Sequence, residues 1–259
     1  QLEGHYNDWY LPDNLVLCAC GPVCREEFRA AAEREFGDWQ RRTVKPVLPA
    51  RVITQTSPRS RWVHDSDSQI GLQLAFRLPG RRDPRTLAVR LLRRILAWGA
   101  GARLPLRLRE ELGLTYAVDA NSLLLDDTGY LAIDLLVAPA NLHAAMSEML
   151  QVLVELREQP LPEAELAAAI RTYLFDLDFS LDQSDSLAVR YGWGLQVDYL
   201  RTLEQDRHDL QQLTPQVLQQ VIRELICSRT LNLVVVGPWS PADRDRVEQC
   251  LAHSGLGPG

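Results

Sequence analysis

Hydrophobic residues recur along this chain with two different periods, and each period predicts one kind of element. Alternating apolar residues, or a short apolar run between turn residues, predict strands, whereas apolar positions three or four residues apart predict helices. The predicted strands are residues 14–21, 69–79, 114–125, 129–138 and 231–237. The predicted helices are residues 26–36, 84–98, 103–111, 139–157, 162–177, 184–196, 215–226 and 241–252.

The order of these elements indicates the fold class. Strands and helices occur in largely separate runs, and Asp126-Asp127-Thr128-Gly129 joins two of the strands as a hairpin turn. The sequence therefore predicts an α+β fold with a largely antiparallel sheet flanked by helices. At 259 residues, 46% of them apolar, the chain is long enough for one large domain, or for one domain and part of another.

The two ends of the chain resemble each other. The apolar run LVLCACGP (15–22) aligns with LNLVVVGP (231–238) at an offset of 216 residues, and an acidic, arginine-bearing helix follows each run. A duplication would mean that the chain begins with the tail of one repeat and continues with a complete repeat. A match this short also arises by chance in α+β proteins, so both explanations stay open at this point. The proline-containing stretch 42–60 between the two parts is typical of a linker.

Charge and composition exclude several classes of function. The formal net charge of −6 excludes sequence-independent binding of nucleic acid, which needs a net basic face. No apolar run approaches the length of about 18 residues that a membrane-spanning helix needs, so we expect no membrane partner. The five cysteines include no C-x-x-C pair and favour a reducing compartment, the cytoplasm rather than the periplasm.

The histidines offer no predicted metal site. All five are scattered, and none stands in H-E-x-x-H or H-x-x-E-H spacing, so we expect no metal ligand in this chain. Ser/His/Asp and Cys/His arrangements can converge in space from any spacing, and no residue is assigned a catalytic role. The acidic segment 176–185 lacks the glycine and the terminal glutamate of a calcium loop and is expected to be a solvated connection between helices. No G-x-S-x-G motif is present either.

One helix stop brings two candidate side chains together. The stretch RLREELGLTY (107–116) predicts a helix that ends at Gly113 and a strand in which Leu114, Tyr116 and Val118 share one face. Arg109 on the last helical turn and Tyr116 at the strand start are both hydrogen-bond donors, suited to a peptide carbonyl or an oxyanion. The structural alternative is that Arg109 complements the helix dipole and that Tyr116 packs in the core.

The order RLPLRLREELGLTYAV, DDTGYLAIDLLVAPANLHAAMSEMLQVLVEL, LPEAELAAAI and SDSLAVRYGWG resembles the C-terminal homologous domain of the M16 metallopeptidases, the pitrilysin, insulinase and mitochondrial processing peptidase family. In this family two homologous α+β domains face each other across a chamber, and the N-terminal one carries the zinc. The resemblance implies that residues 1–41 are the closing strand and helix of an N-terminal domain, 42–60 a linker and 61–259 the C-terminal domain. It also implies that Arg109 and Tyr116 bind substrate.

Two functions follow from the resemblance. The chain is expected to be the non-zinc half of an M16-type zinc metallopeptidase that encloses and binds a peptide substrate, inactive alone, with no cofactor in this chain and zinc in an N-terminal half that the sequence does not contain. Its partner is then that N-terminal domain or a zinc-bearing subunit. The alternative is a non-catalytic partner subunit that binds peptide or shapes a heterodimer. An unrelated small-molecule enzyme is a third hypothesis.

Overall fold

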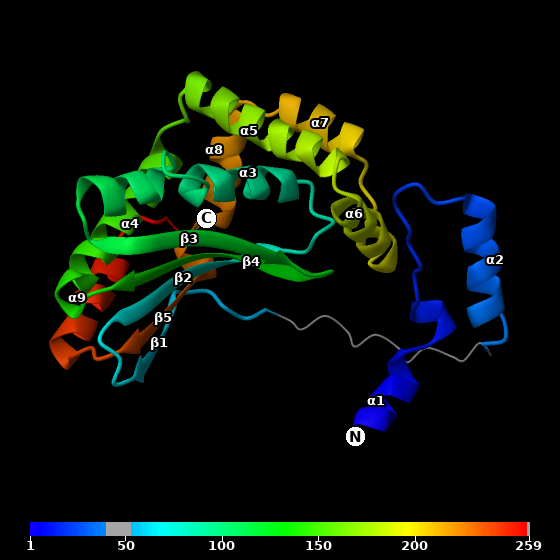
Figure 1. Cartoon of the computed structure of the whole chain (residues 1–259). Helices are drawn as coiled ribbons and strands as arrows, with labels where there is room; N and C mark the ends of the chain where they lie inside the picture. The colour runs from blue at the N-terminus through cyan, green and yellow to red at the C-terminus, as the bar shows by residue number, and fades with distance from the viewer. Residues whose placement is uncertain (40–52, 258–259) are drawn as a thin grey trace. The chain divides into compact units, whose positions relative to one another are not determined.

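The computed structural model describes residues 1–39 and 53–257. These residues form two compact units, one made of residues 1–39 and 173–207 and the other of residues 53–172 and 208–257 (Figure 1). The boundary between the units falls inside α5 (Glu163–Leu181) and α7 (Leu203–Gln211).

A five-stranded sheet forms the centre of the larger unit. Its strands are β1 (Arg59–His64), β2 (Ile70–Pro79), β3 (Thr115–Leu124), β4 (Thr128–Val137) and β5 (Leu231–Gly237), in the spatial order β1-β5-β2-β4-β3. Only β1 pairs with its neighbour in parallel, and the other three pairings are antiparallel. The α+β class with a largely antiparallel sheet is therefore confirmed.

Helices cover one face of this sheet and enclose the core. They are α3 (Thr86–Ala97), α4 (Leu142–Glu158), α8 (Pro215–Leu225) and α9 (Pro241–Ala252), together with the π-helix η2 (Pro105–Glu111) (Figure 1). Leu72, Leu74 and Phe76 of β2 point under these helices and are fully buried or nearly so. Burying a side chain of this size stabilises a fold by about 1.5–3 kcal/mol, so this face holds the unit together.

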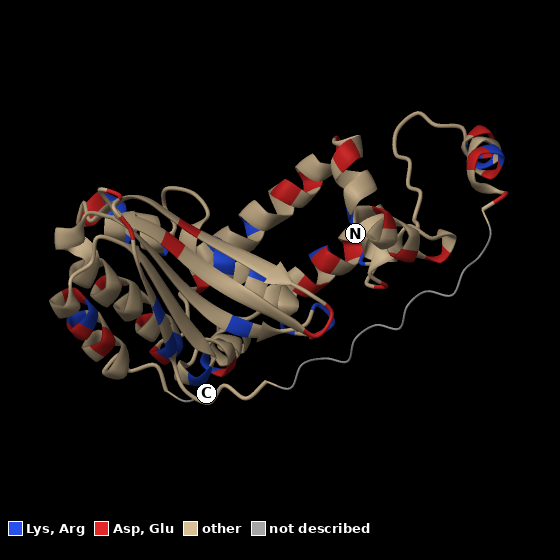
Figure 2. Ribbon diagram, turned by 90° about the horizontal axis from the view of Figure 1, so that it is seen from below, with Lys and Arg blue, Asp and Glu red and all other residues tan. Residues whose placement is uncertain are grey.

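The opposite face of the sheet carries a shallow trough of about 450 Å³. Gly71, Gln73, Asp134, Leu136 and Val234 are among its lining residues, and Leu136 is 52% exposed. Charged residues are sparse on the strands and frequent on the helices (Figure 2). The trough is therefore mainly apolar, with a polar strip at Gln73 and Asp134.

The smaller unit consists of helices and an extended segment. It contains α1 (Leu2–Trp9), α2 (Arg25–Phe36), α6 (Ser184–Gln196) and parts of α5 and α7. The carboxylate of Asp206 is almost fully buried and forms ion pairs with Arg190 and Arg201. Gln196 of α6 donates a hydrogen bond of 2.8 Å to the carbonyl of Asn14, which fixes the start of the extended segment.

Most predicted elements are present in the structure. The predicted bounds of β5, α6 and α9 match the structure residue for residue. Three elements were missed, namely α1, α7 and β1; β1 begins inside the predicted linker 42–60, most of which lies outside the described residues. The strand predicted over residues 14–21 is wrong for this chain, because its extended backbone pairs with no strand of the described sheet.

The acidic segment 176–185 also differs from its prediction. Helix α5 continues to Leu181, four residues beyond the predicted end, so most of the segment is helical. Asp178 there pairs with Arg207 at 2.5 Å, which partly neutralises the cluster. No described helix is both long enough and apolar enough to cross a lipid bilayer.

Candidate functional site

The predicted helix stop at Gly113 is confirmed, and the helix before it is unusual. Residues Pro105–Glu111 form the π-helix η2 rather than an α-helix, and Arg109 lies in its last turn. Gly113 then adopts a left-handed conformation with φ of +60°, which glycine reaches without steric penalty. The amide of Leu114 donates to the carbonyl of Leu108 at 2.8 Å and closes the turn. π-Helices are rare overall, but those that occur often lie at functional sites, which makes this turn a candidate site.

A β-bulge places Tyr116 on the surface. Thr115 pairs with Val137 and Val118 pairs with Leu135, so Tyr116 and Ala117 together face a single residue of β4. An extra residue of this kind re-aims the side chains on either side of it. Tyr116 is 92% exposed. The expectation that Leu114, Tyr116 and Val118 share one face is therefore wrong, and so is the alternative of a tyrosine packed in the core.

Arg109 and Tyr116 line the same pocket, which has a volume of about 550 Å³. Gln69, at the start of β2, and Asn141, at the start of α4, also contribute to its wall. Asn141 donates a hydrogen bond of 3.2 Å from its side-chain amide to the carbonyl of Leu114 and so ties the turn after η2 to α4. The structure thus brings together the two side chains that the sequence predicted to converge.

The guanidinium of Arg109 is available for a new partner. Its Nη2 and Nε atoms both lie 2.8 Å from one carboxylate oxygen of the neighbouring Glu110. The side chain of Arg109 is 40% exposed, and exposed ion pairs stabilise by only about 0–1 kcal/mol. A carbonyl or carboxylate that enters the pocket can therefore compete with Glu110 for this arginine. Together with the Tyr116 hydroxyl, the pocket presents two donors to a ligand.

The described part of the chain holds no cluster of side chains that fits a zinc ion. No group of three His, Cys, Asp or Glu side chains within residues 1–39 and 53–257 could hold a metal ion. A peptidase zinc needs about three protein ligands in tetrahedral geometry. The donor set around Arg109 and Tyr116 is a hydrogen-bonding pocket and not a metal centre.

Two residues of the pocket escaped the sequence argument. Asn141 could have been found, because asparagine is favoured directly before a helix and α4 begins at Leu142 rather than at 139 as predicted. Thr115 could not have been found, since its role depends on a bulge that leaves no mark in the apolar pattern. Both contact the backbone that carries Tyr116.

Comparison with known proteins decides the family. The family model described as the peptidase M16 inactive domain matches residues 1–173, about two thirds of the chain. This chain belongs to the M16 peptidase family. An uncharacterized zinc protease of Mycobacterium tuberculosis is 28% identical to it over 241 residues, which cover 92% of the chain and 55% of that protein. The M16 chain described here thus spans about half the length of this relative.

Solved structures agree on the fold of this M16 domain. A protease from Helicobacter pylori superposes with a TM-score of 0.80 at 18% identity, covering 85% of this chain and 54% of that one. A peptidase M16 inactive domain from Pseudomonas fluorescens superposes with a TM-score of 0.75 at 22% identity, over 85% and 54% of the two chains.

Proposed function

We propose that this chain is the non-zinc half of an M16-type zinc metallopeptidase, and that it helps to enclose and bind the peptide that a zinc-bearing half cleaves. One observation carries the proposal. Arg109 and Tyr116, which belong to different elements, both line one pocket, and neither is held by a strong internal contact. Two such donors are suited to a peptide carbonyl or to the oxyanion formed during hydrolysis.

The trough on the open face of the sheet supports peptide binding. It borders the same region, because Leu136 lines both the trough and the pocket of Arg109 and Tyr116. Gln73 of β2 and Asn121 of β3 donate hydrogen bonds of 2.7 and 2.6 Å to the carboxylate of Asp134 on β4, so side chains from both neighbouring strands fix this carboxylate. An apolar surface with a few fixed polar groups is the usual character of a ligand site.

Zinc is assigned in this proposal to another part of the protein or to a partner subunit. Residues 1–41 would be the closing strand and helix of a zinc-bearing domain, 42–60 the linker and 61–259 the C-terminal domain. The internal repeat supports this division, because the offset of 216 residues that relates the two apolar runs also relates the bounds of α2 (Arg25–Phe36) to those of α9 (Pro241–Ala252). When bound there, zinc would activate the water that attacks the peptide.

The experiment replaces Tyr116 with phenylalanine in the protein that contains the zinc-bearing half. Because Tyr116 is 92% exposed, the fold and its thermal stability should not change. Turnover of an unstructured fluorogenic peptide should fall by a factor of up to about 100 to 1000, the range for loss of one oxyanion donor, and by at least about 10. Tyr130→Phe is the matched control, since Tyr130 is a surface tyrosine of β4 outside the pocket.

Other outcomes point elsewhere. Equal turnover for Tyr116→Phe and the wild type would remove Tyr116 from the site. If the natural zinc-bearing half carries a degenerate H-x-x-E-H motif and no cleavage occurs, while a fluorescein-labelled peptide still binds in a Tyr116-dependent manner, the chain is the non-catalytic partner. The sequence upstream of Gln1 in the gene distinguishes these cases directly.

A further inference from the structure

The bulge that exposes Tyr116 depends on one buried hydroxyl group. Thr115 is 7% exposed, and its Oγ1 lies 2.7 Å from the carbonyl oxygen of Leu136 on β4. The same Oγ1 accepts a hydrogen bond of 3.2 Å from the amide of Ala117 and lies 2.9 Å from the Ala117 carbonyl oxygen. A hydroxyl has one proton to donate, and the shorter distance favours donation to Leu136.

These contacts occupy the place where the strand ladder is interrupted. With two residues of β3 facing Leu136, the regular exchange of backbone hydrogen bonds is lost at this position. The Thr115 hydroxyl joins the Leu136 carbonyl to the Ala117 amide instead. Without it, the Leu136 carbonyl and the Ala117 amide would lose the group that links them, and the bulge would no longer be fixed at this position. A shift of one residue turns every following side chain to the other face of the sheet.

We propose that Thr115 is the positioning residue for Tyr116: its hydroxyl locks the bulge and thereby holds the tyrosine outward at the pocket that it shares with Arg109. The proposal rests on the proposed function, since it concerns the residue expected to bind peptide. Thr115 is 7% exposed, and its role in this proposal is to act through Tyr116. Asn141 acts from the other side of the turn, through its hydrogen bond to the Leu114 carbonyl.

The first test needs no substitution and no substrate. Amide hydrogen exchange is measured in the wild-type chain by nuclear magnetic resonance. The exposed Ala117 amide should exchange at least about tenfold more slowly than in an unstructured peptide, because it donates a hydrogen bond to the Thr115 hydroxyl. Thr115→Val keeps the shape of the side chain and removes the hydroxyl, so the protection should disappear. Thr115→Ser restores the hydroxyl and should restore the protection. An unprotected Ala117 amide in the wild type would overturn the proposal.

The second test links the hydroxyl to Tyr116. In the protein with the zinc-bearing half, Thr115→Val should lower kcat/KM for the fluorogenic peptide by about the same factor as Tyr116→Phe, and Thr115→Ser should recover most of it. Thr115→Val should cause no further loss when added to Tyr116→Phe, because both remove the same interaction. Independent, multiplying losses would overturn the proposal. If Thr115→Val does not fold, the proposal is decided by the Ala117 amide exchange of the wild type and by the kcat/KM of Thr115→Ser, which should stay close to that of the wild type.

The two proposals fail in different ways. If Tyr116→Phe leaves cleavage unchanged, the proposed function of Tyr116 is wrong, and the positioning role is then decided by the exchange of the Ala117 amide in Thr115→Val against Thr115→Ser. If Tyr116→Phe lowers cleavage while Thr115→Val matches the wild type in both cleavage and exchange, the positioning role is wrong and the function of Tyr116 stands.

Discussion

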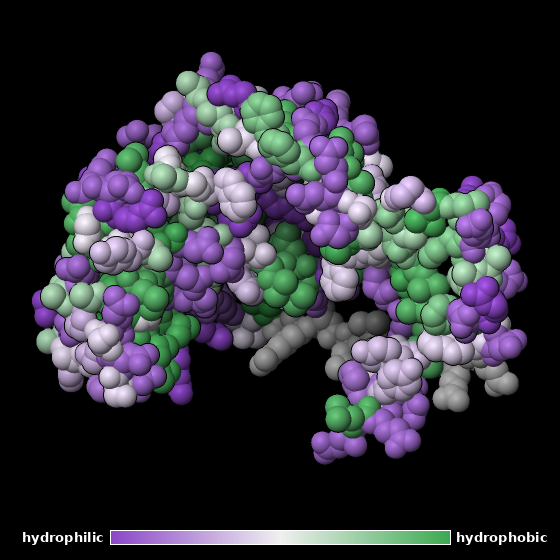
Figure 3. All heavy atoms as spheres, in the orientation of Figure 1, coloured by the Kyte–Doolittle hydropathy of each residue, from purple (hydrophilic) through white to green (hydrophobic). Residues whose placement is uncertain are grey.

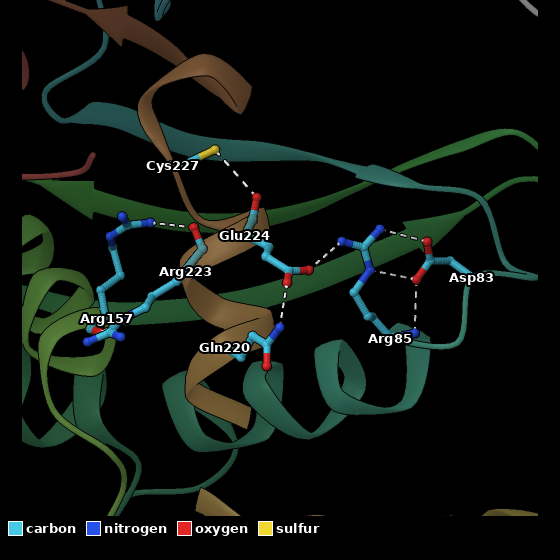
Figure 4. A network of polar contacts seen from close by, with 7 residues as sticks. All are labelled: Asp83, Arg85, Arg157, Gln220, Arg223, Glu224 and Cys227. Carbon is cyan, nitrogen blue, oxygen red and sulfur yellow. Dashed lines mark hydrogen bonds and ion pairs between the residues drawn. The ribbon is translucent and has the colours of Figure 1, made fainter. Parts of the chain in front are cut away.

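Arg157 at the end of α4 secures the end of a different helix. One of its guanidinium nitrogens, Nη1, donates at 2.8 Å to the carbonyl of Arg223 in the last turn of α8 (Figure 4). The same nitrogen donates at 2.6 Å to the carbonyl of Ile226, directly after α8, so both acceptors lie at the helix end, where carbonyls lack partners within the helix. The carbonyl of Arg157 in turn accepts from the side chains of Gln219 and Arg223 at 3.0 and 2.7 Å. Arg157 is 7% exposed, so water cannot easily replace it.

Replacing Arg157 with methionine keeps an unbranched stem and removes the donors. Two hydrogen bonds from a charged donor contribute about 1.5–3 kcal/mol each. Part of this is offset, because the variant no longer buries a charge whose Nε atom has no hydrogen-bond partner among the described residues. The net loss in the free energy of unfolding should be about 2–4 kcal/mol. For a unit of this size that lowers the melting temperature by about 5 to 15 °C.

Urea unfolding followed by circular dichroism measures this loss as a lower midpoint with an unchanged slope. Arg171→Met is the matched control, because Arg171 is an exposed arginine of α5 and its replacement should change stability by no more than about 0.5 kcal/mol. Arg157→Lys keeps the positive charge but not the planar guanidinium, so its loss of stability should lie between those of Arg171→Met and Arg157→Met. A change below about 0.5 kcal/mol for Arg157→Met would refute the assignment of Arg157 as the cap of α8.

Two further predictions concern acid stability and metal content. Arg85 donates to Asp83 and Glu224 (Figure 4), and its hydrogen bonds to Asp83 lower the pKa of that carboxyl, while hydrogen bonds from Gln220 and then Arg85 lower the pKa of Glu224. The contribution of these two carboxylates to the free energy of unfolding is fully present above their unfolded pKa of about 4 and is lost as the pH falls through their lowered folded pKa values. The urea midpoints of the wild type and Arg85→Met should therefore differ at neutral pH and approach each other as the pH falls below about 4. Separately, this chain alone should contain less than one equivalent of zinc by metal analysis and should show no cleavage of unstructured peptides that a chelator abolishes. Stoichiometric zinc would contradict the second prediction.

The parts of the fold that follow from local pattern were predictable. β5 alternates buried and half-buried residues, and Ser240 caps the start of α9 with a capping box, so both elements have clear local signals. β1 was missed because its residues Arg59–His64 are mostly exposed at the edge of the sheet, where no apolar alternation is required. The same limit applies to the site. Arg109, Gly113 and Tyr116 could be placed around one helix stop, but the bulge depends on tertiary pairing with β4.

The two similar segments, residues 15–22 and 231–238, share the features that depend on local sequence but not the strand pairing, which needs neighbouring strands. Gly21 and Gly237 both adopt positive φ, +126° and +141°, and each is followed by a helix of 12 residues at the same offset. These features recur in both copies. The strand does not recur, because β5 pairs with β1 and β2, whereas residues 16–20 make no backbone hydrogen bond to any described residue.

The apolar side chains of this segment are also partly exposed. Leu15 and Leu17 are each about two fifths exposed, and hydrophobic surface is visible over the N-terminal part of the chain in Figure 3. In β5 the matching residues, Leu231 and Leu233, are buried under helices. If this segment were added as a strand to another sheet, its backbone groups would gain hydrogen-bond partners and its apolar side chains would be covered. This is the physical ground on which we propose that residues 1–41 belong to a preceding domain.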